Sequence, residues 1–334
     1  MNPLISVIIP CHNAGAYLKP AIESILSQDY AHWEILLVDD HSDDGSIEAI
    51  PEPILERARI KVLRSPERGV VSAFNTGLYH AKGDYVARMD ADDVSASHRL
   101  NDQIEIFERN TEVGLVGGKV EFFGSKTIAT GTLIYQKWLN SLITPEAIAN
   151  EIYIESPLPN PTIMARRRLW ESLEGYRDTD WPEDYDLLLR AHHDGVRMAK
   201  PERTQLFWRV HDGRVTFNDN RYSLNNFQRA KAHYFSSSRF ADRNILIWGA
   251  GETGKLIYDL LSQKGLKIVG FIDISVRRIG GQKRGLPVIS PEQIDEMQHD
   301  LIIGAAGSRG AREEIRAWLS NRDKKEGENY LFMA

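Results

Sequence analysis

Residues 5–40 have the sequence ISVIIPCHNAGAYLKPAIESILSQDYAHWEILLVDD. The segments Ile5–Pro10 and Glu34–Val38 are continuous apolar, β-branched runs, which are typical of strands buried on both faces of a sheet. Between them, Gly15–Gln28 places its leucines and isoleucines at helical spacing. A strand, a helix and a second strand in this order predict an α/β fold with a parallel, doubly wound sheet.

The alternation continues along the chain. We expect strands at Ile60–Leu63, Tyr85–Met89, Gly114–Val120 and Thr204–Val210, and helices at Val70–His80, Ala96–Arg109, Glu183–His193 and Arg221–Ser238. The stretch from Glu121 to Pro161 is mixed and broken by prolines, so its regular structure is left unassigned. A new αβ pattern begins at Asn244–Trp248, so two domains are expected, residues 1–240 and 241–334.

Composition narrows the class of protein. The chain has 334 residues, and 41 lysines and arginines against 47 aspartates and glutamates give a formal charge of −6, which argues against nucleic-acid binding by bulk charge. Cys11 is the only cysteine, which excludes an intrachain disulfide and a cysteine zinc cluster. With no long apolar run and no basic flank at the N-terminus, we expect a cytoplasmic protein without a signal peptide.

Acidic pairs follow two of the predicted strands. Asp39-Asp40 ends the second strand, and Asp90-Ala91-Asp92 ends the strand that begins at Tyr85. Ligands of open α/β sheets bind beyond the carboxyl ends of the strands. Two carboxylates at positions i and i+2 of an extended segment face the same space, where their repulsion is relieved by a cation. A solvated acidic turn is the alternative, but this context favours a Mn²⁺ or Mg²⁺ site shared with a substrate diphosphate.

Several segments in order resemble a known family. ISVIIPCHNAGAYLKPAIESILSQ, EILLVDDHSDDGS and RGVVSAFNTGLYHAKGDYVARMDADDVSASHRLNDQ are similar to inverting family 2 glycosyltransferases of the GT-A fold. NPTIMARRRLWESLEGY, WPEDYDLLLR and WRVHDGRVT follow in the family's order. The resemblance covers roughly residues 4–235. It implies a hexosyltransferase that uses a nucleotide-sugar donor, with a UDP-sugar favoured.

The resemblance also implies an acceptor and a place of action. The acceptor would be a saccharide or lipid-linked saccharide in the synthesis of cell-envelope polysaccharide, lipopolysaccharide or glycoconjugate. The enzyme would be cytoplasmic, with peripheral association at the inner face of the membrane as an option. The basic run Arg166-Arg167-Arg168 is either a solvated helix start or a site of attraction to phosphate or to an anionic membrane.

The resemblance assigns roles to particular residues. It implies that the donor is bound by Pro10, His12, Asp39, Asp40, Arg68, Asn75, Asp90 and Arg214, and that the metal ligands are Asp92, His211 and Asp90. Asp93 is expected to cap a turn. Asp184 would be the general base, and Glu183 would orient the acceptor or cap the helix. Because a helix N-terminus stabilises carboxylates, helix capping is the alternative reading for both.

The C-terminal domain contains a glycine-rich loop. Gly249, Gly251 and Gly254 follow a predicted strand and open a predicted helix, and Asp273 ends the next strand about 20 residues on, as in dinucleotide-binding folds. The domain resembles the Rossmann-like nucleotide-binding domain of bacterial sugar acyltransferases. Its short length predicts a mononucleotide, a nucleotide sugar or no ligand at these four residues. A second glycine-rich turn predicts a helix capped by Ser308.

Two other functions remain open from the sequence. The chain could be a nucleotide-sugar-modifying oxidoreductase whose C-terminal domain binds NAD, although the sequence contains no Tyr-x-x-x-Lys motif. It could also be a non-catalytic nucleotide-sugar sensor, which would bind the donor without turnover. The complete set of acidic residues favours an enzyme.

Overall fold

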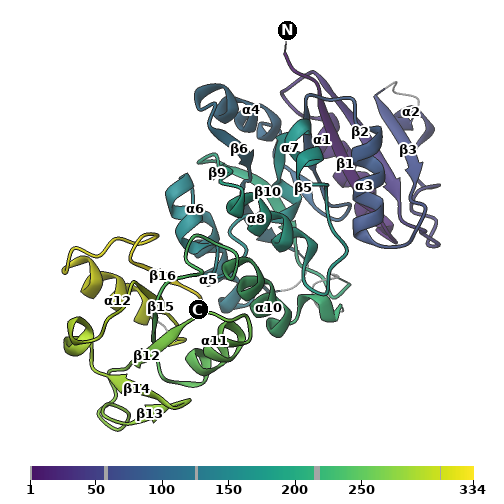
Figure 1. Cartoon of the computed structure of the whole chain (residues 1–334). Coiled ribbons are helices and arrows are strands. Elements are labelled where there is room, and N and C mark those ends of the chain that lie inside the picture. The colour runs from purple at the N-terminus through teal and green to yellow at the C-terminus, as the bar shows by residue number, and fades with distance from the viewer. Residues whose placement is uncertain (1, 56–58, 125–126, 214–218, 309) are drawn as a thin grey trace. The chain divides into compact units, whose positions relative to one another are not determined.

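The computed structural model describes residues 2–55, 59–124, 127–213, 219–308 and 310–334 (Figure 1). The chain divides into two compact units. The first contains Met1–Ile148 and Pro157–Asn220, and the second contains Ala149–Ser156 and Arg221–Ala334. None of the helices within the described ranges is long and apolar enough to cross a membrane.

The first unit is built on a seven-stranded sheet with the order β3-β2-β1-β4-β8-β6-β9. Its strands are β1 (Ile5–Cys11), β2 (Trp33–Asp39), β3 (Ile60–Arg64), β4 (Tyr85–Arg88), β6 (Val113–Val116), β8 (Met164–Arg166) and β9 (Arg197–Ala199). The predicted parallel pairing is confirmed for β1 to β4, whereas β8 is antiparallel to both of its neighbours. The carboxyl ends of β1, β2 and β4 therefore share one edge of the sheet.

The helices of the first unit pack with their apolar faces toward its core. They are η1 (Gly15–Tyr17), α1 (Leu18–Leu26), α2 (Glu52–Leu55), α3 (Val70–His80), α4 (Arg99–Arg109), α5 (Thr130–Ser141), α6 (Pro145–Glu151), η2 (Asn160–Thr162), α7 (Arg167–Ser172) and α8 (Glu183–His193). Figure 1 shows α3 lying along β1. Gly77 permits that approach, since a Cβ there would come within 2.5 Å of Ile8 Cγ2.

A second, three-stranded sheet has the order β5-β10-β7 and consists of Val94–Ser95, Thr204–Arg209 and Lys119–Phe123. The single strand predicted at Gly114–Val120 is wrong, because β6 and β7 belong to different sheets and Gly117-Gly118 lies between them. A Cβ on Gly118 would meet Gln205 Cβ at 2.6 Å. Helix α4 begins at Arg99, after the predicted Ala96, since residues 94–95 pair with β10.

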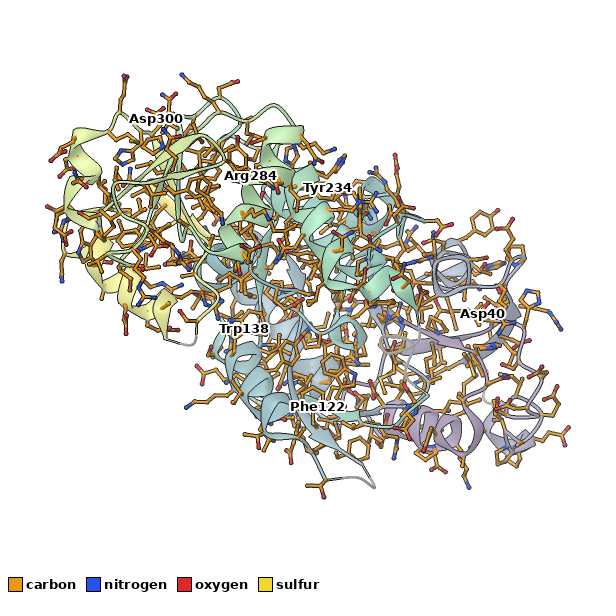
Figure 2. The ribbon with its side chains drawn as sticks, turned by 90° about the horizontal axis from the view of Figure 1, so that it is seen from below. Asp40, Phe122, Trp138, Tyr234, Arg284 and Asp300 are labelled. Carbon is orange, nitrogen blue, oxygen red and sulfur yellow. The ribbon has the colours of Figure 1, made fainter. Side chains whose placement is uncertain are left out.

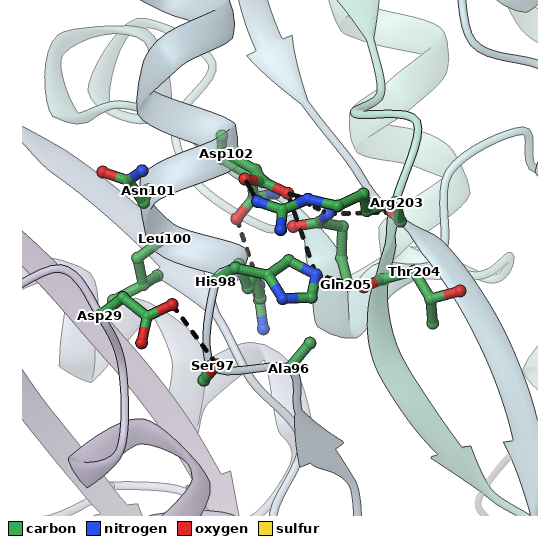
Figure 3. A network of polar contacts seen from close by, with 12 residues as sticks. Asp29, Ala96, Ser97, His98, Leu100, Asn101, Asp102, Arg203, Thr204 and Gln205 are labelled. Atoms are coloured by element: carbon green, nitrogen blue, oxygen red, sulfur yellow. Dashed lines mark hydrogen bonds and ion pairs between the residues drawn. The ribbon is translucent and has the colours of Figure 1, made fainter.

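A polar network fixes the start of β10 against α4 (Figure 3). Asp102 on α4 accepts hydrogen bonds from Arg203 and from Gln205 Nε2, the latter at 2.9 Å. His98 Nε2 lies 3.0 Å from Thr204 O. Because β10 also pairs with β5, directly after the Asp90–Asp93 segment, the end of β10 is brought to the end of β4.

The second unit contains a six-stranded sheet with the order β13-β14-β12-β11-β15-β16, parallel except for β13. The strands are β11 (Ile245–Trp248), β12 (Ile268–Ile272), β13 (Gln282–Lys283), β14 (Leu286–Ile289), β15 (Leu301–Gly304) and β16 (Tyr330–Phe332). The helices are η3 (Asn220–Tyr222), α10 (Leu224–Phe235), α11 (Glu252–Gln263), η4 (Pro291–Glu296) and α12 (Ala311–Ser320). Ser308 does not cap α12, whose N-cap is Gly310 with φ 84°.

The two compact units divide at residue 220, whereas the sequence pattern places the boundary at 240. Helix α10, with Tyr234 labelled in Figure 2, packs within the second unit. Lys231 Nζ on this helix donates to Ile154 O at 2.6 Å and to Met333 O at 3.3 Å, and Phe235 contacts the ring of Tyr153. Residues 1–240 as an independently acting domain stay a prediction.

Candidate active site

Asp40 lies just beyond β2 and is almost fully buried (Figure 2). Its Oδ1 accepts hydrogen bonds from Gly69 N at 2.7 Å and from Ser65 Oγ at 3.3 Å. Gly69 is the N-cap of α3 and has a φ of 130°. The carboxylate is therefore stabilised by the positive end of the α3 dipole.

Two exposed side chains join Asp40 at this edge. His12 Nδ1 lies 2.7 Å from Asp40 O, so this nitrogen is assigned the hydrogen, and His12 Nε2 accepts from Arg68 Nη2 at 2.8 Å. Pro10 lies near the end of β1, paired with Val38. The structure thus brings together the residues that the sequence predicts for donor binding beside β1 and β2.

Asp39 and Asn75 are engaged with the fold itself. Asp39 Oδ1 accepts from Ser42 N at 2.8 Å, which closes the turn after β2. Asn75 Oδ1 accepts from Tyr176 N at 3.0 Å, and Asn75 Nδ2 donates to Tyr176 O at 2.8 Å. These bonds hold Asn75 against the Tyr176 backbone, and its contact with the donor stays a prediction. Arg214 lies outside the described residues.

Three carboxylates meet beyond β4. Asp90, Asp92 and Asp93 each offer an oxygen, and these oxygens lie within 4.8 Å of one another. Asp90 Oδ1 accepts from Arg88 Nε at 3.0 Å and Nη2 at 2.9 Å, and Asp93 Oδ1 accepts from Arg209 N at 2.8 Å. Asp93 thus ties the segment to β10, as well as facing the cluster. This donor set fits a hard divalent cation such as Mg²⁺ or Mn²⁺.

His211 reaches the acidic cluster from the end of β10. Its Nε2 lies 2.7 Å from Asp92 Oδ2, and its ring centroid is 5.1 Å from that of Tyr17. Arg209 donates from Nε to Asp92 O at 2.7 Å, with its guanidinium 4.5 Å from the Tyr17 ring and 4.4 Å from the Phe123 ring. Tyr17 and Arg209 were not predicted, because their spacing carries no signal in the sequence.

The acidic pair Glu183-Asp184 begins α8 after the N-cap Pro182. Glu183 is 1% exposed, while Asp184 is half-buried and its Oδ1 accepts from Tyr185 N at 2.7 Å. Burial raises the pKa of the neighbouring Tyr176 phenol, and the charges of Asp184, Glu183 and Asp90 add to the shift. Carboxylates of the acidic pair and of the cluster beyond β4 therefore both raise the pKa of the Tyr176 phenol.

The glycine loop of the second unit has the predicted local geometry. Gly249 has φ 125°, Gly251 is the N-cap of α11, and Gly254 lies in the first turn of that helix. Both Asp273 oxygens are engaged: Oδ2 accepts from Ala250 N and from Arg278 Nη1, each at 2.9 Å, and Oδ1 accepts from Ser275 N at 2.8 Å. Burial alone would raise the pKa of Asp273, but these hydrogen bonds lower it.

Gly254→Ala is expected to destabilise the second unit by about 3 kcal/mol, because the added Cβ would lie 1.8 Å from Gly249 O and force the helix away from the strand. Gly251→Ala is the matched control. Its Cβ meets nothing nearer than Arg278 Nη1 at 4.0 Å, so the cost is less than about 1 kcal/mol. Thermal unfolding measures both, and equal stability of the two variants would contradict the close helix–strand contact.

Two family models match the chain. "Glycosyl transferase family 2" matches residues 6–172, and "C2185-like, N-terminal" matches residues 241–327. The first covers β1 to β4, the acidic cluster and α7. The second covers the glycine loop and most of the six-stranded sheet of the second unit.

Curated relatives align with the first part of the chain. The putative glycosyltransferase EpsE of Bacillus subtilis is 33% identical over 208 residues, which are 59% of this chain and 69% of EpsE. The Escherichia coli UDP-Glc:alpha-D-GlcNAc-diphosphoundecaprenol beta-1,3-glucosyltransferase WfgD is 33% identical over 135 residues, 40% of this chain and 52% of WfgD. An uncharacterized glycosyltransferase of Haemophilus influenzae is 41% identical over 32% of this chain and 44% of its own length. The chain spans about half the length of the last two relatives.

Solved structures share the fold. S. aureus TarS 1-349 in complex with UDP-GlcNAc matches with a TM-score of 0.58 and 18% identity, covering 77% of this chain and 71% of TarS. The mannosyltransferase PcManGT from Pyrobaculum calidifontis, in complex with GDP-Man and Mn2+, matches with a TM-score of 0.50 and 21% identity, covering 70% of this chain and 62% of that protein.

Proposed function

The chain belongs to glycosyl transferase family 2, and on that basis we propose that this glycosyltransferase is inverting and depends on a divalent metal. Its donor is a UDP-sugar, and its acceptor is a hydroxyl of a saccharide or lipid-linked saccharide in cell-envelope synthesis. The names of two similar proteins support this choice: WfgD takes UDP-Glc and a diphosphoundecaprenol-linked sugar, and TarS is in complex with UDP-GlcNAc.

The proposal rests on the close approach of the Asp90, Asp92 and Asp93 carboxylates. Three carboxylates at one place repel one another unless a cation shares them. Asp92 and Asp90 would hold Mn²⁺ or Mg²⁺, with His211 as a ligand or as a hydrogen-bond partner of Asp92 or the donor phosphate. When bound, such an ion offsets the negative charge that develops on the leaving diphosphate.

The remaining roles belong to the protein's own side chains. His12, Arg68 and Asp40 would bind the nucleoside at the ends of β1 and β2. Asp184 would accept the proton of the acceptor hydroxyl while its oxygen forms a bond to the anomeric carbon and the bond from that carbon to the diphosphate oxygen breaks. One displacement inverts the anomeric configuration. Glu183, almost fully buried at the same helix start, would orient the acceptor or the base.

A screen of UDP-, GDP- and TDP-sugars with Mn²⁺ tests this proposal. We expect metal-dependent binding and slow nucleotide release with one UDP-sugar, and a product of inverted anomeric configuration by NMR once the acceptor is supplied. Turnover that is unchanged in EDTA would contradict the metal, and a retained configuration would contradict the single displacement.

The arginine run has a separate place in this proposal. Arg166, Arg167 and Arg168 line a cavity of about 200 Å³ with Asp84 and Tyr85, at the amino end of β4. The acidic cluster lies beyond the opposite end of that strand. The three arginines would therefore bind an anionic membrane surface rather than the diphosphate of the donor.

The second unit would bind a mononucleotide or nucleotide sugar at Gly249, Gly251 and Gly254. Asp273 would act there by holding the loop through Ala250 N and by placing Arg278, whose Nη1 lies near Gly251. The resemblance of this unit to the nucleotide-binding domain of bacterial sugar acyltransferases stays a prediction. No redox chemistry is proposed for it.

A protein truncated to residues 1–240 is expected to keep donor hydrolysis or transfer and to unfold at a lower temperature. All proposed catalytic residues lie in this part, but truncation removes the Arg316 partner of Glu151 and the Met333 carbonyl bound by Lys231. Nucleotide release and thermal unfolding measure the two effects. A folded, donor-binding 1–240 protein without activity would mean that the second unit completes the active site.

A further inference from the structure

Arg88 is a buried arginine at the end of β4, two residues before Asp90. Its side chain is among the least exposed charged groups described in the first unit, at 4% residue exposure. Its guanidinium carbon lies 5.8 Å from the ring centroid of Phe74 and 5.4 Å from that of Tyr176. A buried guanidinium strongly destabilises a fold unless it is paired. The groups that pair with Arg88 therefore indicate its role.

The partner of Arg88 is a member of the acidic cluster. Nε and Nη2 both donate to Asp90 Oδ1, at 3.0 and 2.9 Å. Both bonds end on one oxygen, so the second oxygen of Asp90 lies outside this pair. The third nitrogen, Nη1, is buried and makes no hydrogen bond to any described residue.

The charges around Arg88 come from both sides of the candidate site. Burial alone would lower the pKa of Arg88, but Asp90, Tyr176 and Glu183 together raise it. Asp90 belongs to the cluster beyond β4, and Glu183 belongs to the acidic pair that begins α8. Of the two, Asp90 has a defined contact with the guanidinium, through the hydrogen bonds from Nε and Nη2.

Other buried arginines of the first unit are arranged differently. Arg190 is 5% exposed and pairs with Asp186 at 2.8 Å, and its remaining nitrogens donate to Leu173 O and Gly175 O. Arg99 donates to Gln103 Oε1 and to Arg88 O. Arg190 donates to a carboxylate outside the acidic cluster and Arg99 donates to neutral acceptors, whereas Arg88 donates to Asp90, a carboxylate of the cluster.

We propose that Arg88 is a positioning residue that fixes Asp90 in the acidic cluster. The inference rests on the proposed metal dependence. Arg88 offsets part of the repulsion among the three carboxylates and holds Asp90 in one orientation. Because the Asp90 carboxylate is already held in one orientation, a divalent ion would bind with a smaller loss of side-chain entropy.

The test compares two conservative changes at equally buried arginines, Arg88→Lys and Arg190→Lys. Calorimetry of Mn²⁺ with UDP present, on the full chain, measures metal affinity without turnover. Arg88→Lys is expected to weaken Mn²⁺ binding about 10-fold or more, in the range typical of residues that orient a metal ligand. Arg190→Lys is expected to stay within about 2-fold of the unchanged protein, even where its thermal stability falls equally.

A second arm asks whether Arg88 acts through Asp90. In an Asp90→Asn background, adding Arg88→Lys should weaken Mn²⁺ binding by less than about 2-fold, because coupled residues are not additive. Arg88→Gln, whose amide keeps an NH₂ donor group but no charge, replaces the lysine variant if that one does not fold.

The outcomes separate the two proposals. Metal affinity unchanged by Arg88→Lys, or weakened equally by Arg190→Lys, would overturn the role of Arg88 and leave the metal site standing. A full effect in the Asp90→Asn background would overturn the action through Asp90. An unchanged protein that binds no Mn²⁺ with UDP would overturn both the metal dependence and this inference.

Discussion

Asp184→Asn is expected to bind the nucleotide-sugar donor with unchanged affinity and to lose turnover by about 100-fold or more, as is typical when a general base is removed. The amide keeps the size and the helix-start position of the carboxylate but cannot accept the acceptor's proton. Asp184 is half-buried at the start of α8, and its charge acts on Tyr176 together with that of Asp90. Calorimetry with the donor and the initial rate of nucleotide release measure the two quantities.

Asp194→Asn is the matched control for this prediction. Asp194 is exposed and caps the other end of the same helix, so the change removes the same charge far from the acidic pair. Its turnover should match that of the unchanged protein. If Asp184→Asn transfers sugar to the true acceptor at the normal rate, Asp184 serves only as part of the helix start.

Asp92→Asn is expected to abolish the effect of Mn²⁺ on donor binding. Because even residues that only support a metal ligand change metal affinity by about 10–100-fold, loss of a ligand should cost about 100-fold or more. Asp92 also forms the contact with His211, so the change releases the imidazole from the cluster. Calorimetry of UDP with and without Mn²⁺ measures the effect.

Asp29→Asn provides the charge-matched comparison for Asp92. Asp29 is exposed in the loop after α1, where its Oδ2 accepts a hydrogen bond from Ser97 Oγ, and it is not one of the three clustered carboxylates. Metal-dependent UDP affinity should be the same in this variant and in the unchanged protein. The ligand role of Asp92 is rejected if Asp92→Asn keeps the full difference between the titrations with and without Mn²⁺.

Local patterns predicted the strongly periodic elements of the first unit, but not α5, α6, β8 or β9. The helices Val70–His80 and Glu183–His193 have the expected bounds. Strand β1 ends one residue later than predicted, and β2 is one residue longer than predicted at each end. Spacing of apolar side chains within one element carries this information. The GT-A fold implied by the resemblance is confirmed by the family match and the TarS structure.

Local sequence patterns did not predict which distant segments pair with one another. Nothing local distinguishes β6 from β7, whose separation depends on β10 and on the close contact of Gly118 with Gln205. The division at residue 220 likewise depends on which residues α10 contacts, and those lie near Ile154 and at the C-terminus. Contacts of this kind are made across the sequence and leave no periodic signal.

The sequence by itself determined the order of the strongly periodic strands and helices and the chemistry available at the strand ends, because periodicity and residue type are local properties. Carboxylates at Asp90 and Asp92 follow directly from a strand that stops there. Only the tertiary structure decided which groups meet them. His211 lies 119 residues from Asp92, and Asn75 lies 101 residues from the Tyr176 backbone that it binds. Such contacts depend on how whole helices and strands pack together. The sequence of a single segment does not encode that packing.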